Sequence, residues 1–125
     1  MKKNGTEIYA LAVCFLAMAA IAVTTVFAIF NALGIAAPAF TVDPWQVDSY
    51  ETNEAYTRYW PKEKPIPAEA VLTVMREAEF GRVLDRERRS SVRRLTLSCI
   101  ILLIASVMFV THWRLHERAR STGVA

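Results

Sequence analysis

The stretch IYALAVCFLAMAAIAVTTVFAIFNALGIAA, from Ile8 to Ala37, decides the fold of this chain of 125 residues. It contains no Asp, Glu, Lys or Arg, and the charge-free run continues to Phe40. A helix of this length would be about 45 Å long, whereas the hydrocarbon core of a bilayer is about 30 Å thick. The run therefore predicts a helix that crosses a membrane with tilt or continues beyond it.

A second charge-free run, LTLSCIILLIASVMFVTHW, extends from Leu95 to Trp113. As a helix it would be about 28 Å long, which matches the hydrocarbon core. Such segregation of charge excludes a soluble single-core enzyme, a disulfide scaffold and a disordered charged tail. Membrane-spanning strands would need a closed barrel of many more segments. We therefore predict an all-α membrane protein, a two-transmembrane-helix hairpin with an aromatic, Pro-rich loop and a long second helix that extends beyond the bilayer.

The composition divides the chain further. Lys2 and Lys3 precede the first run, as they would in a signal peptide, but the run is about twice as long as a signal core, so we expect an uncleaved anchor. The expected segments are an N-terminal tail (1–7), transmembrane helix 1 (8–37), an acidic aromatic surface loop (38–67), a charged extramembrane helix (68–94), transmembrane helix 2 (95–113) and a basic C-terminal tail (114–125).

Small residues recur every four positions along the first run. They are Ala20, Thr24, Ala28, Ala32 and Ala36. Small side chains at this spacing form a candidate helix-packing face, although an Ala-rich helix also produces such a row by composition alone. Asn31 is interpreted as an interfacial residue, with a transport or ligand role as the alternative. Cys14 and Cys99 are expected to be free thiols, because a hairpin would place them too far apart for a disulfide.

The intervening segment has two unlike halves. Four prolines and scattered Trp and Tyr residues between Thr41 and Pro67 argue against a long helix and indicate either interfacial anchoring or a protein-binding epitope. From Ala68 onward the composition predicts a helix that runs into the second span. The arginines just before that span are candidate lipid-headgroup contacts, in particular Arg88, Arg89, Arg93 and Arg94. An acidic partner is an alternative, and we expect no nucleic acid because no binding motif accompanies the arginines.

The charge signals for membrane orientation conflict. Lys2 and Lys3 before the first span favour a cytoplasmic N-terminus, whereas the arginines before the second span favour a cytoplasmic loop. Because the first helix usually sets the orientation, we expect both termini in the cytoplasm. The run from Ile8 to Phe15 resembles the openings of small bacterial membrane proteins. This resemblance implies a bacterial inner membrane.

No catalytic, cofactor or metal motif is present in the sequence. The one suggestive pair is His112 and His116, whose spacing of four can hold a metal or a haem, but no third ligand is evident and both are interpreted as interfacial residues. We therefore expect no enzyme activity and no cofactor. The leading hypothesis is a non-catalytic accessory or assembly subunit that lies in the lipid bilayer and binds another membrane protein or itself as a homo-oligomer. The alternative is an oligomeric small transporter or channel component.

Overall fold

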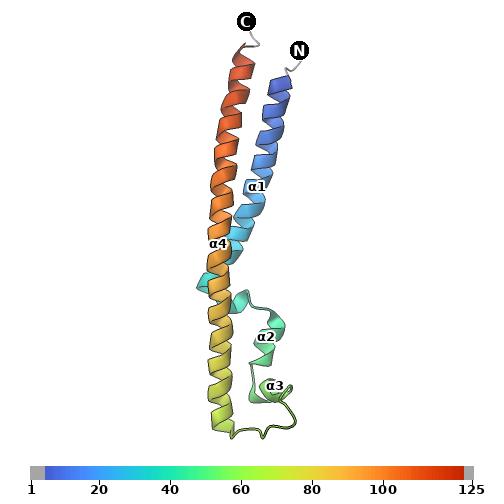
Figure 1. Ribbon diagram of the computed structural model, residues 1–125, viewed down its shortest axis with the longest axis vertical. Coiled ribbons are helices and arrows are strands. Elements are labelled where there is room, and N and C mark those ends of the chain that lie inside the picture. The colour runs from blue at the N-terminus through green and yellow to red at the C-terminus, as the bar shows by residue number, and fades with distance from the viewer. Residues whose placement is uncertain (1–4, 123–125) are drawn as a thin grey trace. The chain divides into compact units, whose positions relative to one another are not determined.

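The computed structural model describes residues 5–122, and every regular element in that range is a helix. Figure 1 shows α1 (Gly5–Ala36), α2 (Pro44–Ser49), α3 (Asn53–Thr57) and α4 (Glu69–Thr122), and a short 3-10 helix (Pro38–Phe40) follows α1. The segment expected as a loop therefore contains three short helices. Lys2 and Lys3, on which part of the expected orientation depends, lie outside the described residues.

Both long helices are long and apolar enough to cross a membrane, and in each only 11 % of the most apolar window is buried within the structure. A core helix of a soluble protein would bury most of that window. Instead, large apolar side chains point outward, such as Phe15, which is 74 % exposed, and Leu103, which is 69 % exposed. Lipid is the solvent in which such exposure is favourable.

Proline and two capping side chains set the boundaries of the shorter elements. Pro38 disfavours the α conformation at Ala37, so α1 ends at Ala36. Asp43 caps α2, since its side chain accepts a hydrogen bond of 3.0 Å from the Trp45 amide, and Pro44 occupies the first helical position. Thr52 caps α3 in the same way, through the Ala55 amide at 3.1 Å.

The chain divides into two units, which we describe separately. The first, the helix-pair unit, contains residues 5–29 of α1 and residues 94–122 of α4. Its two helices run side by side in opposite directions (Figure 1), and the Cys14 thiol lies 3.8 Å from the Phe109 carbonyl oxygen. Small or short side chains dominate the contact between them: the buried positions are Ala10, Cys14, Ala17 and Thr24 on α1 and Ser98, Ala105 and His116 on α4. Such side chains let two helix backbones approach closely.

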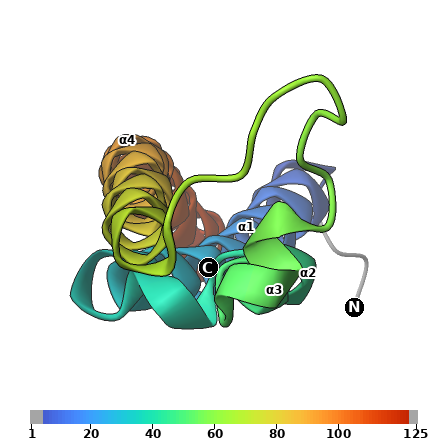
Figure 2. The same cartoon turned by 90° about the horizontal axis from the view of Figure 1, so that it is seen from below.

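The second, the intervening unit, contains residues 30–93. Figure 2 shows α2 and α3 next to each other, with an extended segment that leads from α3 to the start of α4. Asn53 ties α3 to α4, because its side-chain amide donates hydrogen bonds to Glu69 Oε1 at 2.9 Å and to Thr73 Oγ1 at 2.8 Å. Arg76 of α4 donates a further hydrogen bond to the backbone carbonyl of Glu51. These bonds fix the short helices against the first turns of α4.

Within the intervening unit, α1 contacts α4 tightly at Gly34. A Cβ added there would overlap the hydroxyl of Ser91 and lie 3.0 Å from the Ser91 Cβ. Ser91 is only 1 % exposed and donates a hydrogen bond of 3.3 Å to Glu87. Nearby, the Arg88 side chain donates to the Ile35 carbonyl at 3.2 Å. The end of α1 is therefore held against α4 by a contact that only glycine permits.

Candidate functional site

The predicted small-residue face is divided between two environments. Thr24 is buried and Ala28 is half-buried, whereas Ala20, Ala32 and Ala36 are exposed. The physical reason is helical geometry, because each step of four residues advances about 400° and so turns the row by about 40°. The row therefore winds around α1, and only its middle lies on the buried side. The exposed members remain available to lipid or to a partner.

The buried positions of the helix-pair unit instead repeat every seven residues. On α1 they include Ala10, Ala17 and Thr24, and on α4 they include Ser98 and Ala105. A repeat of seven keeps the contacting positions on one side of each helix when the pair supercoils slightly.

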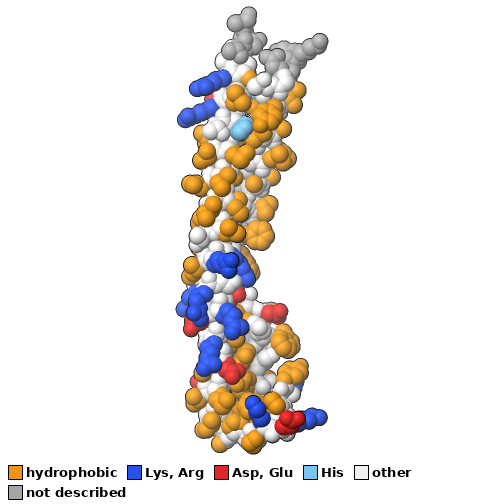
Figure 3. All heavy atoms as spheres, in the orientation of Figure 1, with side chains coloured by type: hydrophobic (Ala, Val, Ile, Leu, Met, Phe, Trp, Pro, Cys, Tyr) orange, Lys and Arg blue, Asp and Glu red, His pale blue; other side chains and the backbone are white. Residues whose placement is uncertain are grey.

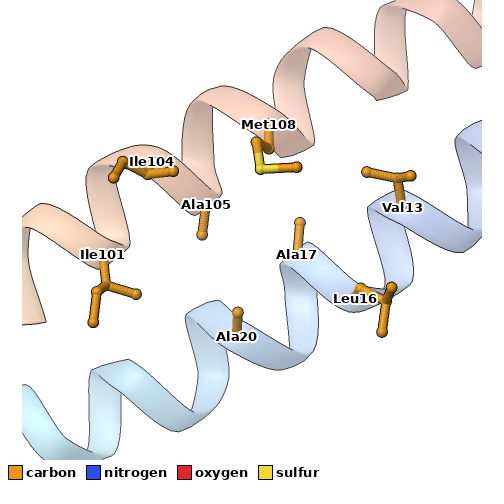
Figure 4. A pocket seen from close by; sticks show the side chains of 8 residues that line it. All are labelled: Val13, Leu16, Ala17, Ala20, Ile101, Ile104, Ala105 and Met108. Carbon is orange, nitrogen blue, oxygen red and sulfur yellow. The ribbon is translucent and has the colours of Figure 1, made fainter.

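An apolar groove lies beside this contact, with a volume of about 370 Å³. Figure 4 shows the side chains that line it, which come from both helices of the helix-pair unit: Val13, Leu16, Ala17, Ala20, Ile101, Ile104, Ala105 and Met108. Three of the eight lining residues are alanines. Since none of these side chains carries a polar group that can bind a polar ligand, the groove suits a hydrocarbon.

The four candidate headgroup contacts, Arg88, Arg89, Arg93 and Arg94, are all exposed on α4, whereas Arg76 near its start is half-buried. Figure 3 shows basic side chains, all of them arginines, gathered on the charged part of α4 that precedes its apolar part. The Nε group of Arg88 donates a hydrogen bond of 3.2 Å to the Ile35 carbonyl, and the Nε group of Arg89 donates one of 3.3 Å to the Asp85 carbonyl. Arg93 and Arg94 are the last charged residues before the apolar run. Whether these four residues contact lipid stays a prediction.

Within the intervening unit, a group of aromatic side chains joins α3 to α4. Tyr50 packs against Tyr56, with ring centroids 5.7 Å apart, and against Phe80 of α4 at 5.6 Å. Trp60 meets Tyr56 edge to face at 6.1 Å. Burial and a hydrogen bond with the Glu79 carboxylate raise the pKa of Tyr56 to about 12, so its hydroxyl stays protonated into the alkaline range in which an exposed tyrosine would ionise. This cluster, Tyr50, Tyr56, Trp60 and Phe80, is the apolar centre that holds α3 on α4.

A second, polar groove runs between α2 and α3, with a volume of about 490 Å³. Its exposed aromatic walls are Trp45, 62 % exposed, and Tyr59, 71 % exposed, with ring centroids 6.3 Å apart. Asp48, Glu51 and Arg58 add charge of both signs to its lining. Exposed Trp and Tyr beside an arginine are the side chains that most often carry binding energy in protein interfaces. We call this the α2–α3 groove.

Sequence reasoning identified the aromatic segment but did not identify the α2–α3 groove. The sequence does contain signals for the starts of these helices. Asp43 stands directly before Pro44, and Thr52 stands three residues before Ala55, and both are residue types that cap helix N-termini. These would have indicated two short helices and therefore which side chains share a face. The pairing of Trp45 with Tyr59 depends on how the two helices pack, and no local pattern encodes it.

The two histidines do not form a metal site with other residues in the described part of the chain. The His112 Nδ1 atom lies 2.8 Å from the Met108 carbonyl oxygen, and the His112 ring meets Tyr9 edge to face at 5.9 Å. His116 is buried beside Trp113, with the two ring centroids 5.8 Å apart, and the His116 Nδ1 atom has no hydrogen-bond partner. Among residues 5–122, no group of three or more His, Cys, Asp and Glu side chains could hold a metal ion. Cys14 and Cys99 are both free thiols, the first buried and the second exposed.

Comparisons with known proteins supply no relative from which a function could be transferred. No family model, no curated protein and no solved structure matches the chain.

Proposed function

We propose that the chain is a non-catalytic accessory or assembly subunit of a larger membrane complex. The observation that carries this proposal is the α2–α3 groove, in which Trp45 and Tyr59 are exposed beside Asp48, Glu51 and Arg58. A protein partner that covers these aromatic side chains gains both apolar area and charge pairing. The groove's occupant in this proposal is a polar segment of a partner protein.

In this proposal α1 and the apolar part of α4 cross the bilayer as a hairpin. The outward-facing apolar side chains of both helices support it, as does the charged stretch of α4 that ends at Arg94. The membrane is the bacterial inner membrane, both termini are cytoplasmic, and the intervening unit, which carries the docking groove, lies outside.

A labelling experiment tests this orientation. The exposed Glu63 is replaced by Cys in a chain whose Cys14 and Cys99 are changed to Ser, and intact cells are treated with a membrane-impermeant maleimide. We expect Cys at position 63 to be labelled from outside. Labelling only after the cells are opened would place the intervening unit in the cytoplasm. An exposed C-terminal position, Ser121 replaced by Cys, is the matched control and should be labelled only in opened cells.

Mild-detergent extraction tests the subunit proposal. We expect the tagged chain to be recovered with a foreign membrane protein at fixed stoichiometry, measured by native mass spectrometry. Trp45→Ser combined with Tyr59→Ser should reduce that recovery at least tenfold, since interface Trp and Tyr side chains each contribute about 2 kcal/mol or more where they anchor binding. Phe40→Ser is the control, because Phe40 is 80 % exposed and does not line the α2–α3 groove.

Two other outcomes contradict the proposal. A homo-oligomer that conducts ions in liposomes would favour the transporter or channel alternative. A stable monomer with no partner would leave the exposed Trp45 and Tyr59 without the role proposed for them.

A further inference from the structure

Arg94 is the last charged residue of α4 before the apolar run whose side chains line the groove of the helix-pair unit. Arg94 precedes Ile101 by seven residues, and Met108 follows Ile101 by seven. Seven residues return to within about 20° of the same side of a helix, so Arg94 lies on the face of α4 that carries Ile101 and Met108 into the groove. The rise from Arg94 to Ile101 is about 10 Å.

This order along one face, a cation and then hydrocarbon, matches the order of groups in a phospholipid. A phosphate at Arg94 would place the start of an acyl chain beside Ile101 and Ala20, and the chain would continue past Ala105 toward Met108. Arginine suits the headgroup, since its guanidinium pairs with phosphate through two parallel hydrogen bonds. The groove then covers the hydrocarbon, which it can do without any polar contact.

Charge argues against a second copy of the chain as the occupant. The membrane-spanning part of α1 carries no acidic residue between Ile8 and Phe40, and α4 carries none between Leu95 and Trp113. Neither span could therefore offer a carboxylate to Arg94. The part of α4 before Arg94 is rich in arginine, so a second copy aligned with it would bring like charges together.

We propose that the helix-pair unit binds an anionic phospholipid, with its phosphate at Arg94 and one acyl chain in the groove between Ala20 and Ile101. The site is independent of the α2–α3 groove and of any protein partner. It assigns Arg94 a role distinct from that of Arg89, which lies on another face of α4.

Native mass spectrometry of the full chain in mild detergent tests the site. The probes are phosphatidylglycerol and phosphatidylcholine with identical acyl chains. We expect about fivefold greater retention of phosphatidylglycerol, which corresponds to about 1 kcal/mol for one arginine at an anionic headgroup. Arg94→Gln should reduce this ratio to about one. Ala20→Leu should fill the groove and reduce the retention of both lipids.

Matched variants distinguish the site from general attraction to the membrane. Arg89→Gln removes the same charge about 140° around α4 from Arg94, and should keep the fivefold ratio. Ala19→Leu adds the same volume at an exposed neighbour of Ala20 that does not line the groove, and should keep the retention. Far-ultraviolet circular dichroism confirms that all four variants are equally helical.

Three results would overturn the proposal. The first is an unchanged lipid ratio for Arg94→Gln, and the second is an equal loss of the ratio for Arg89→Gln, which would indicate attraction by net charge alone. The third is a lipid-free dimer that Ala20→Leu dissociates, which would identify a second copy as the occupant of the groove.

Discussion

Gly34→Ala is expected to lower the free energy of unfolding by about 1–3 kcal/mol, the usual cost of forcing extra volume into a packed contact. The new Cβ would overlap the Ser91 hydroxyl, and it would still lie only 3.0 Å from the Ser91 Cβ after that hydroxyl rotates away. Rotation also disturbs the hydrogen bond of 3.3 Å from Ser91 to Glu87. Thermal unfolding of the full chain in detergent, followed by circular dichroism, measures the loss.

Gly81→Ala is the matched control for this prediction. Gly81 lies within α4, and a Cβ added there meets nothing within 4 Å. Alanine in a helix interior is favoured over glycine by about 1 kcal/mol, so this variant should be more stable than the parent chain. Gly34→Ala should therefore decrease the stability while Gly81→Ala increases it. This opposite effect distinguishes the steric contact at Gly34 from the general preference of a helix for alanine over glycine.

A double-mutant cycle identifies Ser91 as the cause. Ser91→Gly removes both atoms that the new Cβ would meet first, so Gly34→Ala should cost much less in its presence. Additive effects of the two substitutions would contradict the assigned contact, as would a Gly34→Ala variant as stable as the parent.

Tyr50→Ala is the second substitution with a large expected effect, and it should lower the free energy of unfolding by about 2–3 kcal/mol. The ring of Tyr50 lies between those of Tyr56 and Phe80, with centroid distances of 5.7 Å and 5.6 Å. Its removal leaves a cavity between α3 and α4 and ends two aromatic contacts, each of which contributes about 0.5–1.5 kcal/mol beyond the buried area. We expect α2 and α3 to separate from α4.

Hydrogen exchange read by mass spectrometry locates this effect. The amides of α2 and α3 should exchange faster in Tyr50→Ala, because local opening needs less free energy, while residues 5–29 should exchange as before. Tyr59→Ala is the control, since Tyr59 is 71 % exposed and its ring lies beside that of Trp45, with the two centroids 6.3 Å apart. Exchange in Tyr50→Ala that matches the Tyr59→Ala variant would show that Tyr50 does not hold the short helices.

The two long helices were predictable because their apolar runs lack any charged residue. Such runs leave no other stable backbone arrangement in lipid than a helix, so the identity of individual residues hardly matters. The buried side of each helix was not predictable by the same reasoning. In a soluble helix the buried face is apolar and the other face polar, whereas here Ala17 on the buried side and Leu16 beside it are equally compatible with lipid.

The intervening unit shows a different limit. Its prolines correctly indicate that no long helix covers residues 41–67, and Asp43 and Thr52 mark the starts of short helices. The aromatic contacts that hold those helices, above all Tyr50 with Phe80, join residues distant in the sequence. Aromatic residues in such a segment fit membrane anchoring and tertiary packing equally well, and only the fold distinguishes the packed Tyr50 from the exposed Trp45.

The contact between Gly34 and Ser91 also has an evolutionary consequence. Two positions that share one fixed space must vary together, so relatives of this chain with a larger residue at position 34 should have a smaller one at position 91. The sum of the two side-chain volumes should vary less among relatives than either volume alone. This inverse relation would mark the crossing of the two helices in sequences whose membrane-spanning runs have diverged.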